Sequence, residues 1–457
     1  MSAAGDNFRE WCWALFECAR NPYYILVVIY VFGPYFTQEV IGDPIRGQAL
    51  WGYINGVSGA VVALCAPFLG AMADHLGRRK PGIAIAALVM APAVFILWFA
   101  VPGAAGAAVL LIALTLTLAG ICYAFSEVLH NAMLVTVAPN TLGRASGRGL
   151  AMGNAGSVTL LVLVFFGIAL PASGLFDWAI LPDSPWFGLD PSTAEDRRIV
   201  GPICAVWLLI FTLPLMLWVP DAPAGAPFGR AMRLGLQDLL ETVREARRYA
   251  NIIRYLLARM LFNDGKMAIM TFGTIYGVAL FGWGIIEPLL LGIVLSVVAV
   301  IGGLMGGVME NAMGSRRALL IDLGIIAATL IFTLLLTPQG FLFADIDGFD
   351  AQVLPLPWFN TPAQLLYVGM SFLYALFITA AYANSRSLLV RIAPPESVTR
   401  FFGLYALSGQ VTAFAAPLAI GLLTALTQSQ RGGMLIIFAF LAAGIWLLWG
   451  VREARES

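Results

Sequence analysis

Apolar residues fill most of the chain in long runs that short polar connections separate. Runs long enough to cross a bilayer as a helix, which takes roughly 20 residues, occur at about 11–39, 48–73, 82–101, 107–133, 146–171, 201–220, 255–281, 287–309, 318–337, 362–386, 401–426 and 432–450. No long stretch alternates apolar and polar residues, so helices rather than a barrel satisfy the backbone hydrogen bonds in lipid. The pattern predicts an all-α membrane protein with about twelve transmembrane helices.

Composition supports this prediction. Of the 457 residues, 60% are hydrophobic and only 11% are charged, whereas about a quarter of a soluble domain is charged. The formal net charge is zero, so nothing favours a nucleic-acid partner. The five cysteines lack the spacing of a disulfide framework or metal site, and we interpret them as small buried hydrophobes: Cys12, Cys18, Cys65, Cys122 and Cys204.

Basic residues predict the orientation, because short basic connections stay in the cytoplasm. With the N-terminus inside, most of the 26 Lys and Arg residues fall in cytoplasmic connections. Both termini are therefore expected in the cytoplasm, and the bacterial inner membrane is the expected location. The opening "MSAAGDNFRE" lacks the pattern of a signal peptide, so the first apolar run should remain in the mature protein.

The chain repeats itself. "LFECAR" at 15–20 aligns with "LFNDGK" at 261–266, and the same offset places Tyr30 on Tyr276. "LVTVAP" before residue 140 likewise matches "LVRIAP" before residue 395. Such repeats are typical of transporters built from two related helix bundles. The sequence thus predicts two pseudo-symmetric six-helix halves.

The repeat divides the chain into an N-terminal half at 1–220, a linker at 221–254 and a C-terminal half at 255–457. The linker contains "LGLQDLLETVREARRYA", with apolar residues at helical spacing and arginines on the other face. We expect it to lie along the membrane surface as an amphipathic helix. A connecting role is preferred over a partner-binding one.

A third repeated pair follows the second helix of each half. "GAMADHLGRRK" starts at Gly70 and "GGVMENAMGSRR" at Gly306; each has an acid four residues on, then glycine and two arginines. Glycine permits close helix approach, and the acid can pair with arginine or a helix N-terminus. Breaking this cluster would be one step in opening an inner gate. The candidate gating residues are Gly70, Asp74, Gly77, Arg78, Arg79, Gly306, Glu310, Arg316 and Arg317.

The motif beginning at Gly70 resembles the signature connection of the major facilitator superfamily. Finer similarity comes from "WALFECARNPYY", "HNAMLVTVAPNTLGRASGRGLAMGNAG", "LLARMLFNDG" and "SRSLLVRIAPPESVTRFFGLYALSGQ". Together these resemble the branch of autophagy-related vacuolar amino-acid effluxers and related bacterial permeases. The resemblance implies the major facilitator fold and transport by alternating access. The chain departs from the family pattern at Glu17, commonly Asp, and at Arg20, commonly a small amide.

Ionisable residues inside the spans gather on the first, fourth, seventh and tenth helices. Each costs about 2.5–3.5 kcal/mol in lipid, so they should face protein or water. In the resembled superfamily these four helices line the central cavity. The candidate substrate-binding residues are Glu17, Arg20, Tyr30, Glu127, Asn131, Asn263, Asp264, Lys266, Tyr276, Asn384 and Arg386. The proton-coupling candidates are Glu17, Glu127, His130 and Asp264.

Structural interpretations stay open beside these functional ones. Glu17 and Arg20 share a helix face, and they could simply pair with each other or with Glu127 to hold the bundle. His130 could sit at an inner interface, and Arg386 could anchor the end of its helix. Asp322, near the inner end of the ninth helix, falls outside the predicted cavity set.

The sequence predicts a secondary transporter of a small polar, zwitterionic or anionic solute such as an amino acid. No nucleotide-binding signature is present, so an ion gradient or the substrate's own gradient must drive transport. A proton is the favoured ion because carboxylates lie beside basic residues. We expect a monomer with no cofactor, no metal and no enzymatic activity. A lipid or amphiphile flippase on the same fold is the alternative, and a non-transporting receptor is less favoured.

Overall fold

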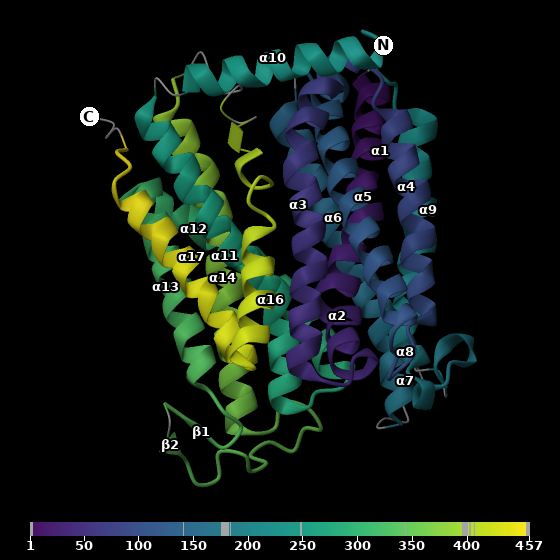
Figure 1. Ribbon diagram of the computed structural model, residues 1–457, viewed down its shortest axis with the longest axis vertical. Coiled ribbons are helices and arrows are strands. Elements are labelled where there is room, and N and C mark those ends of the chain that lie inside the picture. Colours follow the sequence, from purple (N-terminus) through teal and green to yellow (C-terminus); the bar gives the residue numbers. More distant parts are fainter. Residues whose placement is uncertain are drawn as a thin grey trace. The chain divides into compact units, whose positions relative to one another are not determined.

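The computed structural model describes the chain except for residues 1, 2, 140, 175–181, 183, 247, 248, 343, 395–400, 402, 403, 406 and 454–457. The described chain is built almost entirely of helices (Figure 1). In chain order these are α1 (Ala3–Pro22), α2 (Phe32–Tyr35), α3 (Pro44–Leu76), α4 (Lys80–Phe95), α5 (Ala107–Val137), α6 (Leu142–Val164), α7 (Leu170–Ser173), α8 (Glu195–Arg198), α9 (Val200–Trp218), α10 (Phe228–Ala246), α11 (Ala250–Phe281), α12 (Ile286–Met313), α13 (Ser315–Leu335), α14 (Pro362–Ile392), α16 (Ala415–Thr427) and α17 (Gln430–Trp449).

The predicted all-α class is confirmed. Within the described residues, nine helices are long and apolar enough to cross a membrane, and α16 is a shorter apolar helix. The long helix α11 carries Arg254, Arg259, Asp264 and Lys266, which lower its hydropathy. A single antiparallel pair of two-residue strands, β1 (Gly340–Phe341) and β2 (Ala344–Asp345), is the exception in the described part of the chain. The total of twelve spans stays a prediction.

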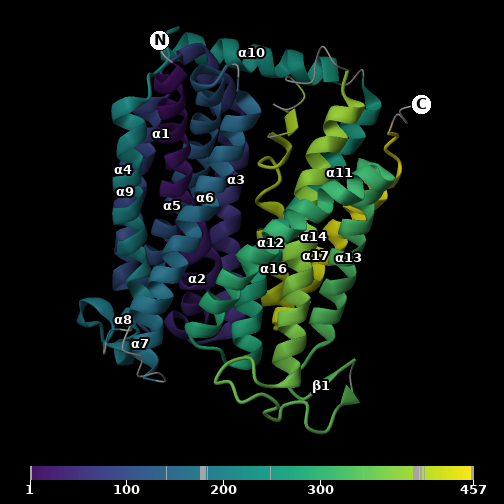
Figure 2. The ribbon, with the colours of Figure 1, turned by 180° about the vertical axis from the view of Figure 1, so that it is seen from behind.

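Two compact units make up the chain. The first comprises residues 1–43 and 54–241, and the second comprises 44–53 and 242–457. In the first unit α4 packs against α5 and α9, and α1 packs against α9. In the second unit α13 packs against α14 and α17, and α11 packs against α17 (Figures 1 and 2). Three helix pairings therefore recur in the two units, and the division into two related six-helix halves stays a prediction.

Helix α1 changes form at a proline. Pro22 has no N–H, so the carbonyl of Cys18 loses its helical donor. The indole Nε1 of Trp207 on α9 donates to that carbonyl at 2.8 Å instead. Beyond Pro22 the chain continues as a π-helix over Tyr23–Tyr30, a wider turn that is common at functional positions. A second π-helical turn spans Phe36–Val40 after α2.

Glycines bring α6 against α1 in the first unit. A Cβ atom at Gly156 would lie 2.5 Å from the Cys18 sulfur and 2.8 Å from its carbonyl oxygen. One at Gly153 would lie 3.4 Å from the Cβ of Glu17. Small residues allow such close backbone approach between membrane helices. The sequence "GRASGRGLAMGNAG" thus sets the depth at which α1 and its charges lie.

The cysteine interpretation needs one correction. Cys12, Cys18, Cys122 and Cys204 are buried, as expected, but Cys65 is exposed on α3. An apolar run alone does not say which of its positions face protein, because lipid accepts apolar side chains as readily as a protein core does.

Candidate functional site

A buried ionic cluster joins α1 and α5 in the first unit. Arg20 is only 5% exposed, and its guanidinium lies 2.8 Å from Oε2 of Glu17 and 3.3 Å from Oε2 of Glu127. The same guanidinium lies over the Tyr123 ring, 4.7 Å from its centroid. Two carboxylates and a ring face therefore surround one cation, which offsets the cost of burying it.

His130 completes this cluster from α5. Its ring is fully buried and stacks on the Trp13 indole with centroids 4.3 Å apart. Nε2 lies 2.9 Å from the Trp13 carbonyl oxygen, and Nδ1 lies 3.1 Å from Oε1 of Glu17. A carbonyl oxygen only accepts hydrogen bonds, so Nε2 carries a hydrogen. The contact between Nδ1 and Glu17 then requires one more proton, held by either the ring or the carboxyl group.

A second polar cluster lies in the second unit, on α11, α13 and α14. Asp322 and Asn384 are both fully buried, and the Asn384 amide Nδ2 donates to Oδ2 of Asp322 at 2.7 Å. Lys266 is 1% exposed and interacts electrostatically with Asp322. Its ammonium lies 3.7 Å from the centroid of the Tyr382 ring and 5.4 Å from that of Phe262.

Three more polar side chains of α11 are buried near Lys266 in the sequence. Asp264 is 3% exposed and leaves its Oδ2 without a hydrogen-bond partner. Arg259 donates to the Tyr405 carbonyl at 2.6 Å and lies over the ring of that residue. Asn263 is 7% exposed. The polar positions that the sequence predicts on this helix are thus inside the protein.

Four of the predicted binding residues lie outside both clusters. Tyr30 is half-buried in the π-helical segment after α1, and Asn131 and Arg386 are exposed. Tyr276 is buried, and its hydroxyl accepts from Nε of Arg431 at 3.0 Å. The sequence places these residues on helices that it predicts to line a cavity, but it does not fix the helix rotation that decides which side chains each residue contacts.

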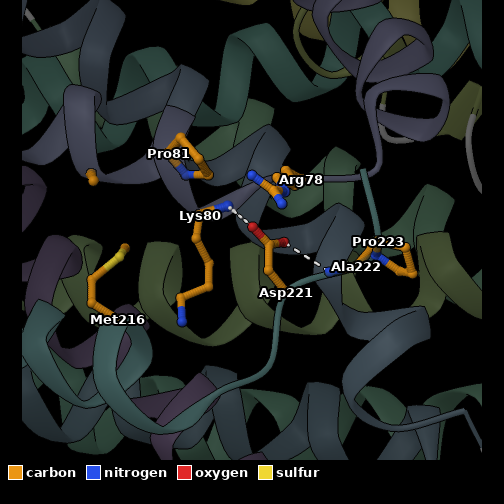
Figure 3. A pocket seen from close by; sticks show the side chains of 8 residues that line it. Arg78, Lys80, Pro81, Met216, Asp221, Ala222 and Pro223 are labelled. Carbon is orange, nitrogen blue, oxygen red and sulfur yellow. Dashed lines mark hydrogen bonds between the residues drawn. The ribbon is translucent and has the colours of Figure 1, made fainter. Parts of the chain in front are cut away.

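The first gating segment, which contains Gly77, Arg78 and Arg79, contacts Asp221. The carboxylate of Asp221 accepts from the backbone N–H group of Arg79 at 2.9 Å, at the start of α4. It also accepts from the backbone N–H group of Lys80 at 3.1 Å, a bond that Figure 3 shows. A negative group at a helix N-terminus is favourable because the helix dipole is positive there. Gly77 has φ +75°, and a Cβ there would lie 1.9 Å from the Pro223 carbonyl oxygen, so the turn requires glycine.

Arginines of the same segment have different surroundings. Arg79 is 9% exposed and donates to the Thr136 hydroxyl at 3.1 Å. Arg78 is exposed and lines a small pocket together with Lys80 and Asp221 (Figure 3). Gly70 and Asp74 lie within α3, but the surroundings of Gly70 and the side chain of Asp74 are outside the described part of the structure.

An ionic group that the sequence did not predict stands at the same end of the first unit. Glu10 of α1 is 3% exposed and contacts Arg148 at 2.7 Å and Arg144 at 3.2 Å, both on α6. It also accepts from the Thr141 hydroxyl at 2.5 Å. An acid directly before an apolar run, with two arginines at the start of a later one, is the sequence signal that could have revealed it.

The second gating segment centres on acids at the end of α12 and after α17. Glu310 contacts Arg391 at 3.1 Å and accepts from the Ser315 hydroxyl at 2.9 Å. Glu453 accepts from the backbone N–H groups at Ser315 and Arg316, which begin α13.

The other predicted members of that segment are spread around it. The Arg316 side chain donates to the carbonyl of Trp449, and Arg317 is exposed. A Cβ at Gly306 would lie 2.9 Å from the Ala380 Cα atom, so this glycine sits at a close crossing of α12 and α14. Glu310, the predicted acid of this segment, therefore forms its ion pair with Arg391 of α14, which is not one of the predicted gating residues.

Asp322 is a buried acid outside the predicted set. The sequence predicts that the first, fourth, seventh and tenth helices line the cavity, and Asp322 lies on the ninth. Its position within an apolar run was itself a signal, since an ionisable residue there needs a partner. The partner, Asn384, was among the predicted residues, but sequence alone gives no means of joining the two.

Residues 140–457 match the family described as "Vacuole effluxer Atg22 like". An uncharacterized MFS-type transporter, YxiO of Bacillus subtilis, is 24% identical and aligns over 98% of this chain and 96% of its own length. Autophagy-related protein 22 of Cryptococcus neoformans is 22% identical over 69% of this chain, and the match spans 54% of that protein. The chain thus spans about half the length of this fungal relative.

Solved structures share the fold. A bacterial homologue of the human lysosomal transporter Spinster, in an inward-facing and unoccupied conformation, superimposes with a TM-score of 0.66. That match covers 100% of both chains at 15% sequence identity. Together with the helix pairings, the similarity establishes the major facilitator fold that the sequence motifs predicted.

Proposed function

Because the chain belongs to the family of vacuole effluxers like Atg22 and is a membrane transporter of the major facilitator type, we propose that it is a proton-coupled secondary transporter. The proposed cargo is a small zwitterionic or anionic solute, such as an amino acid. The observation that carries this proposal is the buried cluster in which carboxylates hold Arg20 while Nδ1 of His130 lies 3.1 Å from Oε1 of Glu17.

Proton binding and anion binding are connected in this cluster. Loss of the shared proton leaves a carboxylate oxygen and a ring lone pair facing each other at 3.1 Å, so that contact cannot persist. The Glu17 carboxylate then competes with any solute carboxylate for Arg20. Protonation has the opposite effect, because it weakens the hold of Glu17 on the guanidinium and frees that group for a ligand.

The remaining parts of the proposal follow from charge placement. The connections rich in Arg and Lys support cytoplasmic termini and a bacterial plasma-membrane location. We propose that residues 1–220 and 255–457 form related halves joined by the segment 221–254, in a monomer. A C-terminal fluorescent-protein fusion should fold and fluoresce in bacterial cells, whereas a C-terminal alkaline-phosphatase fusion should be inactive.

Transport in proteoliposomes tests the function. Purified protein is first screened by thermal shift against amino acids, dipeptides, organic acids and sugars, since a ligand stabilises the folded state. Uptake of the stabilising solute should follow an imposed pH gradient. Glu17→Gln should abolish this dependence and leave solute exchange active, with Glu127→Gln and Asp264→Asn tested beside it.

The matched control is Glu39→Gln. Glu39 also pairs with an arginine, Arg197, at 3.1 Å, but it lies outside the cluster. This variant should keep its response to the gradient. Uptake that ignores the pH gradient in the wild-type protein would overturn proton coupling, and a screen that finds only amphiphiles would favour a flippase.

A further inference from the structure

The pair formed by Asp322 and Asn384 leaves two oxygen atoms without partners. Both side chains are fully buried, and one hydrogen bond of 2.7 Å joins Nδ2 of Asn384 to Oδ2 of Asp322. Oδ1 of Asp322 and Oδ1 of Asn384 are buried and have no hydrogen-bond partner. A buried acceptor without a donor costs about 1–3 kcal/mol, more when it is charged.

One proton satisfies both oxygen atoms. A carboxylic acid and a primary amide can pair through two parallel hydrogen bonds, in which the amide N–H donates to one carboxyl oxygen and the carboxyl O–H donates to the amide oxygen. The first of these bonds is already present. If the Asn384 amide is rotated so that its nitrogen and oxygen exchange places, the amide oxygen lies next to Oδ2 of Asp322, and the carboxyl group must again carry a proton. The requirement for a proton therefore does not depend on the amide orientation.

We propose that Asp322 binds a proton, shared with Asn384, and that this pair is a second proton site of the transporter. It lies in the second unit, on α13 and α14, and is separate from the pair of Glu17 and His130 on α1 and α5. The proposal rests on the proposed function only for the role of the proton in transport.

Lys266 is the charged group with an electrostatic effect on Asp322. It comes from α11, and the two side chains interact electrostatically. The helices packed against α13 are α12, α14 and α17. Their charged residues, with those of α13 itself, lie towards helix ends or are exposed: Glu287, Glu310, Arg316, Arg317, Arg386, Arg391 and Arg431.

This arrangement connects the proton to an anion. With Asp322 neutral, no aspartate charge competes for the Lys266 ammonium, so a conformation that opens this buried group to the solute favours a solute carboxylate there. With Asp322 ionised, the aspartate attracts Lys266 and competes with that solute. Proton and anion therefore favour each other's binding, and the coupling must act equally in both directions.

Infrared spectroscopy of the purified protein tests the proton without any solute. A protonated carboxyl group has a C=O stretching band that is distinct from carboxylate bands and shifts on exchange into heavy water. The difference between wild type and Asp322→Asn at pH 7 should contain this band. The control Asp196→Asn removes a buried aspartate that lies 3.4 Å from Arg197, and its difference spectrum should contain carboxylate bands instead.

Asp322→Asn should fold, because an amide at 322 can form both hydrogen bonds with Asn384. It should catalyse solute exchange but fail to accumulate solute against a gradient. Asp322→Leu leaves Asn384 without its partner and should melt at a lower temperature than Asp322→Asn. Equal melting temperatures for these two variants would count against the hydrogen-bonded pair.

Three results would overturn the proposal. The first is a carboxylate band, rather than a carboxylic-acid band, in the difference spectrum of Asp322→Asn. The second is full gradient-driven accumulation by that variant. The third is stabilisation of the wild type by sodium that Asp322→Asn abolishes, because this would assign the site to a metal cation. An infrared band together with transport that ignores pH would refute proton coupling and leave the proton site standing.

Discussion

Arg20 is the residue at which a structural and a transport role compete. It is nearly buried, and both of its acidic partners lie within 3.3 Å. Removal of the guanidinium leaves two acids, but each keeps a means of stabilisation. Glu17 still contacts His130, and the Glu127 side chain is 35% exposed to solvent. The fold should therefore tolerate the loss of Arg20, which makes its transport role measurable.

Arg20→Ala should weaken solute binding by at least about 1.5 kcal/mol, the low end for a hydrogen bond to a charged group. Melting temperature and affinity for the stabilising solute should be measured together in detergent. A purely structural role predicts a different result. The single variant would then lose stability, the double variant with Glu17→Ala would regain it, and affinity would stay intact throughout.

Residue types and approximate depth were readable from the sequence, but side-chain partners were not. The spacing of Glu17 and Arg20 predicts one helix face, and the structure has that ion pair at 2.8 Å. The bond between Asp322 and Asn384 joins residues on separate helices, and no local rule connects them. Helix rotation decides such contacts, and in a membrane helix the lipid-facing and protein-facing sides are both apolar.

At the scale of elements, the proline in α1 allows a test of whether Trp207 replaces the helical hydrogen bond that Pro22 removes. Trp207→Phe should lower stability by about 1 kcal/mol or more, because the Cys18 carbonyl loses its donor. Pro22→Ala restores a backbone N–H at the position that would serve this carbonyl. The double variant should therefore melt above Trp207→Phe, and additive losses in the two single variants would contradict the compensation.

Gly156 on α6 tests the close approach to α1. Gly156→Ala places a Cβ within 2.5 Å of the Cys18 sulfur, and we expect a loss of about 1–3 kcal/mol from overpacking. Gly147→Ala on the same helix is the matched control, since no atom lies within 4 Å of the new Cβ. That control should hold or raise the melting temperature, because alanine favours helix more than glycine does. Equal melting temperatures for both variants would refute the tight contact.

Helix positions were the most predictable part of the fold, and helix irregularities the least. The expected run at 11–39 covers α1, two π-helical turns and α2, a division that hydropathy cannot show. The apolar run expected at 401–426 contains α16, which begins only at Ala415. Hydrophobic length predicts that a segment crosses the membrane, whereas backbone form depends on prolines and on tertiary donors such as Trp207.

At the scale of the whole molecule, the repeat relates each unit to the other through sequence and through helix pairing. Equivalent positions have nevertheless acquired different chemistry. Arg20 is enclosed by two acids, while its counterpart Lys266 lies over aromatic rings and interacts electrostatically with Asp322. Two related bundles with unequal charge clusters could bind proton and solute at separate places, which is what coupling requires.

The repeated acids after the second helix of each half should control the rate of conformational exchange. Glu310 ties the end of α12 to Arg391 on α14 at 3.1 Å, and Asp74 is its counterpart in the sequence repeat. Neither position belongs to the ionic clusters proposed to bind solute. Glu310→Gln and Asp74→Asn should therefore slow transport by roughly tenfold, equivalent to about 1.4 kcal/mol in the barrier, and should leave solute affinity unchanged.

Asp345→Asn, in an exposed strand of the second unit, is the control and should transport normally. Affinity from thermal shift and rate from proteoliposome exchange separate the two effects, since a residue that only biases conformations need not touch the ligand. Loss of solute binding with an unchanged exchange rate would place these acids in the binding site and remove them from the gate.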